Sequence, residues 1–193
     1  HTRWLRVSWA RRCVKETVAT GGTVLATKLA LNYGIACNTA GGSHHATSNE
    51  GAGFCVFNDV AVAAKYLTSR GLANKILIID LDVHQGNGNS EIFKNDNQVF
   101  TFSMHSRVNY PAKKSVSDLD IELEENLEDR EYIDILKKNL KNLNQEEFDF
   151  VFYIAGVDIH YNDRLGKLKI SDNGIFESCL LYTSDAADDM LRV

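Results

Sequence analysis

The stretch "KILIIDLDVHQGNG", residues 75–88, decides the fold. Its first half is continuously apolar, which predicts a strand buried on both faces, as the strands of a parallel sheet are. The run ends in Asp80, Asp82 and His84, which alternate along the chain and point to one side if the extended geometry persists. Carboxylate and imidazole groups are zinc ligands, and carboxylates are costly to bury without a cation or hydrogen bonds. We therefore interpret the stretch as a strand that leads into a metal site, with a merely solvated strand end as the alternative.

Apolar runs rich in β-branched and aromatic residues recur along the chain and alternate with segments of helical spacing. The predicted strands are 35–38, 75–80, 98–103 and 148–156, and the predicted helices are 14–31, 58–69 and 129–143. This alternation indicates an α/β fold with a mainly parallel sheet flanked by helices. In such sheets ligands bind beyond the carboxyl ends of the strands, so the residues after each apolar run are the candidates for chemistry.

The run "IAGVDIHYNDRLG", residues 154–166, repeats the arrangement of the first strand end. An apolar strand runs into Gly156, and Asp158 follows where a third metal ligand is expected. Two carboxylates and one imidazole would leave the fourth zinc position open for water, as a catalytic zinc site requires. His160 is the second candidate for this third ligand and ranks below Asp158. The alternative role for Asp158 is to cap a turn.

The stretch "GGSHHATSNE", residues 41–50, places two adjacent histidines behind a glycine pair. If His44 and His45 were both metal ligands, the metal would lose its open position. Imidazole can accept and return a proton near neutral pH, so proton transfer is the favoured interpretation, with ligation and a purely structural role as alternatives. Gly86 and Gly88, which follow the strand-end ligands, are expected to let the chain turn sharply around the site.

Length and charge limit the classes of function. The chain has 193 residues, enough for one sizeable domain, with 44% hydrophobic and 24% charged residues. The net charge of -5 weighs against a nucleic-acid surface, and the one basic cluster is interpreted as part of a solvated helix. That cluster consists of Arg3, Arg6, Arg11 and Arg12, with Trp4 and Trp9 between them.

The cysteines and the hydropathy pattern bear on the compartment. The four cysteines form no CxxC pair, which favours free thiols in a reducing cytosol over disulfides or a thiolate zinc site. No apolar run approaches the roughly 20 residues of a membrane span, and no signal peptide is recognisable. We expect no membrane association and a cytoplasmic location, or a nuclear one in a eukaryote. The cysteines are Cys13, Cys37, Cys55 and Cys179.

Five segments, in order along the chain, resemble the histone deacetylase family, within the arginase/deacetylase fold. They are "GGSHHA", "GAGFCVFND", "IIDLDVHQGNG", "FSMHSRVNYP" and "AGVDIHYNDRLGKLKIS", and the resemblance spans residues 15–177. "DLDVHQGNG" and "NDRLGKLKIS" are most similar to the class IV branch and its bacterial relatives. The resemblance implies a three-layer domain and a zinc-dependent hydrolase that removes acetyl or acyl groups through a metal-activated water. The implied substrate is an acylated lysine in a protein or an acetylated small amine.

The resemblance also implies roles for particular residues. The zinc ligands it implies are Asp82, His84 and Asp158. His45 matches the general base, His44 its electrostatic partner, and Asp80 the acid that orients His44. The positions that match the channel for an acyl-lysine side chain are Gly53, Phe54 and Tyr110. A monovalent-cation site for K⁺ would be lined by Asp80, Asp82, His84, Ser103 and Met104.

Two departures from the family pattern affect these expectations. Asn87 stands where many members have an aspartate beside the second histidine, so His45 is expected to be less basic than it would be beside Asp. The tyrosine that the family carries in a glycine-rich C-terminal segment has no counterpart, since Tyr182 lacks that context. We therefore expect a catalytic domain over 1–178 that is incomplete at its C-terminus, followed by a tail at 179–193 that is foreign to the family.

Several functions are compatible with these patterns. A zinc-dependent deacetylase acting on lysine-like amines is the leading hypothesis, and an acetylpolyamine amidohydrolase is its near variant. An inactive fragment that keeps the metal site but lacks the catalytic tyrosine is the second. An arginase-like dimanganese hydrolase is the third, and it would need more carboxylates at the strand ends than the sequence offers.

Overall fold

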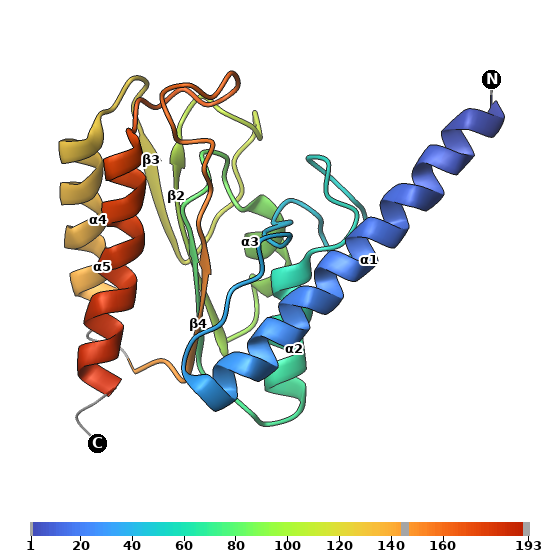
Figure 1. The fold of residues 1–193 in the computed structure, drawn as a ribbon, viewed down its shortest axis with the longest axis horizontal. Helices are drawn as coiled ribbons and strands as arrows, with labels where there is room; N and C mark the ends of the chain where they lie inside the picture. Colours follow the sequence, from blue (N-terminus) through green and yellow to red (C-terminus); the bar gives the residue numbers. More distant parts are fainter. Residues whose placement is uncertain (1, 144–146, 191–193) are drawn as a thin grey trace.

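Within the described residues, four parallel strands form one sheet in the order β3-β2-β1-β4 (Figure 1). The structure is a computed structural model that describes residues 2–143 and 147–190, with side chains over 13–143 and 147–181. The strands are β1 (Ile76–Asp80), β2 (Val99–Ser106), β3 (Leu119–Leu123) and β4 (Phe150–Ile154). The helices are α1 (Thr2–Tyr33), α2 (Asp59–Ser69), α3 (Asn87–Phe93), α4 (Asp129–Leu143) and α5 (Asp172–Met190).

Helices cover both faces of the sheet, with α4 and α5 on one face and α1 and α2 on the other (Figure 1). Successive side chains of a strand point to opposite faces, so β1 contributes to two cores. Leu77 and Ile79 pack in the core beneath α4, whereas Ile76 and Ile78 pack in the core beneath α2. All of β1 is buried, as its continuous apolar run predicts. The expected α/β architecture, a parallel sheet between two helical layers, is confirmed.

The amphipathic segment 129–143 forms α4 with the predicted bounds. Its buried residues recur at helical spacing and face the sheet, because a stripe of apolar side chains is the part of a helix that gains from burial. Asp129 accepts hydrogen bonds from the amide and hydroxyl of Ser171, which ties the start of α4 to the start of α5. The buried residues of α4 are Tyr132, Ile133, Leu136, Leu140 and Leu143.

The prediction of a strand at 35–38 is wrong. This segment is irregular backbone, and Ile35 is 68% exposed rather than buried in the sheet. Asn38 instead turns back to α1, where its Nδ2 donates to the carbonyl of Ala19 at 3.0 Å and to Thr23 Oγ1 at 2.7 Å. The side chain of Asn38 thus bonds to a helix, and the three apolar residues before it, at 35–37, do not pair with any strand of the sheet.

Both ends of the described chain lie in helices. The predicted helix 14–31 lies inside α1, and the N-terminal basic cluster lies outside the residues whose side chains are described. The expected boundary before 179–193 falls inside α5, whose side chains are described only as far as Leu181, so a foreign origin of that tail stays a prediction. The four cysteines form no disulfide among the residues whose side chains are described, and a reducing compartment stays a prediction.

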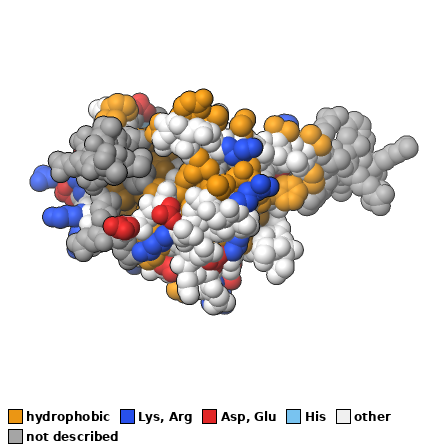
Figure 2. All heavy atoms as spheres, turned by 90° about the horizontal axis from the view of Figure 1, so that it is seen from below, with side chains coloured by type: hydrophobic (Ala, Val, Ile, Leu, Met, Phe, Trp, Pro, Cys, Tyr) orange, Lys and Arg blue, Asp and Glu red, His pale blue; other side chains and the backbone are white. Residues whose placement is uncertain are grey.

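Part of the apolar surface is exposed. Figure 2 shows hydrophobic side chains gathered on the face of the molecule seen from below. Large hydrophobic residues are exposed along the second half of α1 and just after it, including Leu25, Leu29, Tyr33 and Ile35. None of the described helices combines the length and the apolar character that a membrane span requires.

Candidate functional site

The two strand ends that the sequence singles out lie side by side, because β1 and β4 are neighbours in the sheet. Asp82, His84 and Asp158 each offer one ligand atom, and the three atoms lie within 4.8 Å of one another. His84 Nδ1 is 2.9 Å from Asp82 Oδ1 and 3.0 Å from Asp158 Oδ2. The backbone holds both carboxylates, since the amide of His84 donates to Asp82 Oδ1 and the amide of Val83 to Asp158 Oδ1.

The charges of this group suit a divalent cation. Hydrogen bonds with Asp158 and Asp82 raise the pKa of His84 to about 9, against the opposing effect of burial. Burial alone would raise the pKa of Asp82, but its hydrogen bond with His84 lowers that pKa to about 2. Two carboxylate oxygens and a ring nitrogen thus converge on one proton, and metal ions compete with protons for such donors. The donor set fits Zn²⁺ and leaves a coordination position open.

His44 is buried beside the metal-ligand group and is paired with a carboxylate. Its Nδ1 is 2.6 Å from Asp80 Oδ2, and its Nε2 is 3.7 Å from Asp82 Oδ1. Burial favours the neutral imidazole, but the carboxylates of Asp80, Asp82 and Asp158 outweigh it and raise the pKa of His44 to about 9. The imidazolium is therefore the stable form of His44 near neutral pH.

The ring of His45 packs against that of His44 at a tilt of 47°, with 4.1 Å between the centroids, yet its hydrogen-bond partner is an amide. His45 Nδ1 is 2.7 Å from Asn87 Oδ1, and because an amide oxygen only accepts, Nδ1 carries the proton and Nε2 the lone pair. Burial and the charge of His44 lower the pKa of His45 to about 4, so this histidine is neutral near pH 7. The hydrogen bond to Asn87 acts in the opposite direction and favours the imidazolium, so the low pKa of His45 comes from burial and from the charge of His44. Whether His45 is less basic beside Asn87 than it would be beside an aspartate stays a prediction.

Two glycines allow the backbone to approach the histidines closely. A Cβ on Gly88 would collide with the carbonyl oxygens of His44 and Ala46, so only glycine lets the start of α3 pack against this loop. A Cβ on Gly53 would collide with the His45 ring, and Gly53 also has a positive φ of 52°. Gly88 has no such positive φ, so its role is close approach rather than the sharp turn that the sequence predicts.

The predicted channel residues lie around His45. The ring of Tyr110 meets that of His45 edge-on, with 4.9 Å between centroids, and is 45% exposed. Phe54 follows Gly53 in a left-handed conformation, with φ 67°, and its side chain is 80% exposed. The structure therefore places Gly53 and Tyr110 against the proton-transfer candidate and Phe54 at the surface next to them.

The residues predicted to line a monovalent-cation site lie at and after the end of β1 and within β2. Asp80 and Ser103 are register partners across these strands. Ser103 Oγ is 3.0 Å from His105 Nδ1 and accepts a hydrogen bond from the amide of Gly86 at 3.3 Å. The end of β1 is thus adjacent to this part of β2, as such a site needs, and the binding of K⁺ stays a prediction.

His160, the second-ranked ligand candidate, faces away from the metal-ligand group. Its Nε2 is 3.3 Å from Asp172 Oδ1, and its Nδ1 accepts a hydrogen bond from the amide of Asn162. Its ring stacks on Tyr161, with 4.2 Å between centroids. Nδ1 is thus used by a neighbouring backbone amide and Nε2 lies near Asp172 at the start of α5, so His160 does not belong to the group formed by Asp82, His84 and Asp158.

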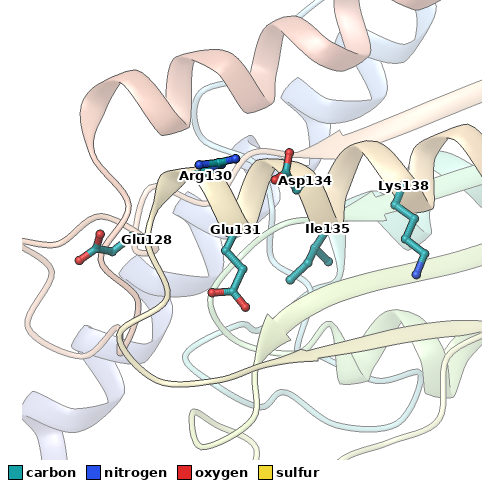
Figure 3. Close-up of a pocket in the computed structure, with 6 residues that line it drawn as sticks. All are labelled: Glu128, Arg130, Glu131, Asp134, Ile135 and Lys138. Atoms are coloured by element: carbon teal, nitrogen blue, oxygen red, sulfur yellow. The ribbon is translucent and has the colours of Figure 1, made fainter.

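A groove of about 470 Å³ lies elsewhere, along α4 (Figure 3). In Figure 3 the side chains of Glu131, Ile135 and Lys138 point to the same side of the helix. The groove is open and mostly charged, and none of the predicted site residues lines it, so the strand ends remain the candidate site. Its lining residues are Glu128, Arg130, Glu131, Asp134, Ile135 and Lys138.

One buried carboxylate near the histidines was missed by the sequence analysis. Asp59, at the start of α2, accepts hydrogen bonds from the amides of Ser43 at 2.7 Å and Gly42 at 3.1 Å. Its Oδ2 also accepts from the hydroxyl of Thr23 on α1. These bonds fix the loop directly before His44. The motif "FND" contains Asp59 but indicates only a helix start, and nothing in its local pattern points to a loop 16 residues earlier.

Comparisons with known proteins agree with this arrangement. Residues 8–190 match the histone deacetylase domain. An uncharacterized protein of Picosynechococcus is 50% identical over 189 residues, and histone deacetylase 2 of Arabidopsis thaliana is 38% identical over 160 residues. These matches cover 96% and 80% of this chain but 63% and 41% of the relatives, so the chain spans only part of their length. A solved HDAC homologue complexed with SAHA superposes with a TM-score of 0.82 at 30% identity, over 88% of this chain and 49% of that one.

Proposed function

The chain belongs to the histone deacetylase family, and on that premise we propose that it is a zinc-dependent hydrolase that removes acetyl or other acyl groups from lysine-like amines. The observation that carries the proposal is the group of Asp82, His84 and Asp158 next to two buried histidines, one paired with a carboxylate and the other with an amide. The activity of the whole protein is part of the proposal, because the chain spans about half of its solved relative. Its motifs favour the class IV branch.

The metal would be held by the three residues that already share a proton. Asp82 and Asp158 would supply oxygen and His84 nitrogen, and replacing the proton with a dication would neutralise the two carboxylates. A bound zinc ion would supply a Lewis acid that polarises the scissile carbonyl and acidifies water. A dimanganese hydrolase would need a second set of carboxylates, and the described residues bring together one group of three ligands.

The histidines would divide the proton chemistry between them. His45 holds its proton on Nδ1 against Asn87, so its Nε2 is free to take a proton from the attacking water and return it to the leaving amine. His44, charged against Asp80, would place a fixed positive charge where negative charge develops on the carbonyl oxygen. The two identical side chains thus have different roles because their partners differ.

The channel residues suit an amine with an aliphatic stem. Tyr110 presents a half-exposed ring beside His45, and Gly53 lets the opposite backbone come close. Aromatic rings bury a methylene chain well without requiring a charge partner for it. The substrate class is therefore an acylated lysine in a protein or an acetylated small amine. A K⁺ ion between the end of β1 and the neighbouring part of β2 would add rigidity beneath the site.

Turnover of an acetyl-lysine peptide by the zinc-loaded chain tests the proposal. Wild type should release acetate and should be inhibited by SAHA, and Asp82→Asn should lose both zinc and turnover. Asp134→Asn, the same change on the exposed side of α4, should behave as wild type. Full turnover in Asp82→Asn would refute the ligand assignment.

A metal-binding chain without turnover is the second candidate. It is favoured because the sequence contains no glycine-rich segment with the tyrosine that the family resemblance implies. Losing one donor to the developing oxyanion costs roughly 10²–10³ in rate. The turnover experiment separates the two candidates. A metal-binding chain without turnover should bind zinc and SAHA but should release no acetate from an acetyl-lysine peptide or an acetylated polyamine.

A further inference from the structure

Gln85 lies directly after the metal-ligand candidate His84 and is 1% exposed, yet the proposed chemistry does not use it. Its backbone amide donates to the carbonyl oxygen of Tyr110 at 3.3 Å. A buried amide side chain is retained at little cost only where its polar atoms find partners. The partners of Gln85 therefore show what the residue does.

The side chain of Gln85 pairs with the backbone of one residue, as a neighbouring strand would. Its Nε2 donates to the carbonyl of Ser115 at 3.0 Å, and its Oε1 accepts from the amide of Ser115 at 2.8 Å. Nε2 also donates to Asp120 Oδ1 at 2.9 Å, and Asp120 Oδ2 accepts from the amide of Ser117. Both N–H groups of the amide are therefore used, and the residue ties the end of β1 to the start of β3.

The segment held in this way, residues 107–118, carries the channel residue Tyr110. Lys114 Nζ donates to the carbonyls of Asn109 and Pro111, which closes the segment on itself around Tyr110. Asn109 Nδ2 donates to the carbonyl of Leu165, beyond the third ligand candidate. The segment is also held at Arg107 by the carbonyl of Leu123, at Ser115 Oγ by Glu91 and at Asp118 by Thr101. The bonds from Gln85 join it to the stretch after β1 that carries two of the metal-ligand candidates.

We propose that Gln85 is a positioning residue that holds Tyr110 against His45 and so sets the fit of the acylated amine in the channel. The expected effect on substrate fit rests on the proposed function, whereas the link, the hydrogen bonds from Gln85 to the segment 107–118, is a property of the fold. Gln85 acts through Ser115 and Tyr110 and touches neither the metal ligands' donor atoms nor the proton carried by His45.

Gln85→Glu is the sharpest variant, because it keeps the shape and the acceptor but turns two donors into a carboxylate that faces Ser115 O and Asp120. We expect KM for an acetyl-lysine peptide to rise about tenfold, with kcat within about threefold of wild type, as the loss of buried hydrogen bonds implies. Adding Asp120→Asn restores a donor toward the introduced carboxylate and should recover most of the KM. Gln98→Glu, the same change at an exposed position, is the matched control and should leave KM unchanged.

Hydrogen exchange of the metal-free chain supplies the second readout, independent of turnover. Peptides covering 107–118 should exchange at least about tenfold faster in Gln85→Glu than in wild type, while β1 stays protected. If Gln85→Glu does not fold, Asp120→Asn alone removes one side-chain bond and should shift KM and exchange in the same direction by less.

Several results would overturn the inference. Exchange and KM at wild-type values in Gln85→Glu would show that the link does not hold Tyr110. Loss of zinc with unchanged exchange over 107–118 would place the role of Gln85 at the metal instead. If the wild-type chain turns over no substrate, the proposed function fails, and the exchange comparison still decides whether Gln85 holds the segment.

Discussion

The two adjacent histidines have nearly the same local geometry and opposite electrostatics. Each directs Nδ1 at a side-chain oxygen, at 2.6 Å from Asp80 for His44 and at 2.7 Å from Asn87 for His45. Their pKa values are about 9 and about 4. The burial of both rings is similar, so the difference comes from the charges around them: His44 faces carboxylates, whereas His45 faces an amide and the charged His44.

The comparison shows how one short sequence supplies both a fixed charge and a proton carrier. A protonated base could not accept a further proton, and a charged neighbour stabilises an oxyanion more strongly than a neutral one. Because His44 is charged first, it keeps His45 neutral, and the pair titrates as a unit. Which histidine is charged therefore depends more on the partner residues, Asp80 and Asn87, than on the positions of the two rings.

Asp80→Asn should have the largest effect, because it gives His44 the same kind of partner that His45 has. The change removes one member of a buried charged pair, which typically costs about 3–5 kcal/mol. We expect a lower free energy of unfolding, a lower pKa for His44 and a strong loss of turnover. Urea unfolding and NMR titration of the imidazole resonances measure both effects, and a His44 pKa still near 9 would contradict the account.

Gly88→Ala should disturb both histidines together, because the new methyl group meets the backbone of His44 and Ala46. Overpacking of this kind typically costs about 1–3 kcal/mol. Gly21→Ala is the control, since a Cβ there meets nothing within 4 Å, and in a helix interior it should stabilise by about 0.5–1 kcal/mol. Equal stability of the two variants in urea unfolding would disprove the close approach at Gly88.

Asn87→Asp should make His45 resemble His44. A carboxylate on Nδ1 favours the imidazolium and should raise the pKa of His45 by about 1–3 units. The acid limb of the pH–rate profile should move to higher pH by the same amount, since His45 must be neutral to accept a proton. An unchanged profile in this variant would mean that another group is the base.

The pH dependence of stability in the metal-free chain tests the comparison of the two histidines further, and it should show the smallest effect of these experiments. The raised pKa values of His44 and His84 contribute stability that is complete below 6.5 and is lost as pH rises through about 9. The lowered pKa of His45 acts in the other direction, so stability falls as pH drops from 6.5 toward about 4. Unfolding free energy should therefore peak near pH 6.5, and His44→Gln should flatten the alkaline side. A steady rise in stability from pH 6.5 to pH 9 would contradict these assignments.

Much of the fold could be predicted because the two central strands, β1 and β2, are buried on both faces, and because the edge strand β4 is apolar although it is only partly buried. β1, β2 and β4 show as continuous apolar runs, and α4 shows as a regular apolar stripe. β3 was missed because every second residue of "LDIEL" is acidic, so the segment shows no continuous apolar run, and its residues are mostly only half-buried. α3 was missed because "NGNSEIF" is short and carries glycine and asparagine, and its stability comes from packing on the histidine loop rather than from propensity.

The metal-ligand residues could be predicted because each stands directly after a strand, and the sheet order then brings them together. Gln85 and Asp59 could not be predicted in the same way. Their partners, Ser115 and Ser43, lie 30 and 16 residues away along the chain and contribute backbone groups that no side-chain pattern marks. Contacts from a side chain to a distant loop backbone are set by tertiary structure alone.

Zinc titration of three proteins, followed by calorimetry at pH 7, tests the central claim that Asp82, His84 and Asp158 hold the metal while His44 and His45 handle protons. The account predicts one zinc ion per chain for wild type and for His45→Gln, and no tight site for Asp158→Asn. Loss of zinc in His45→Gln, or a full site in Asp158→Asn, would contradict it.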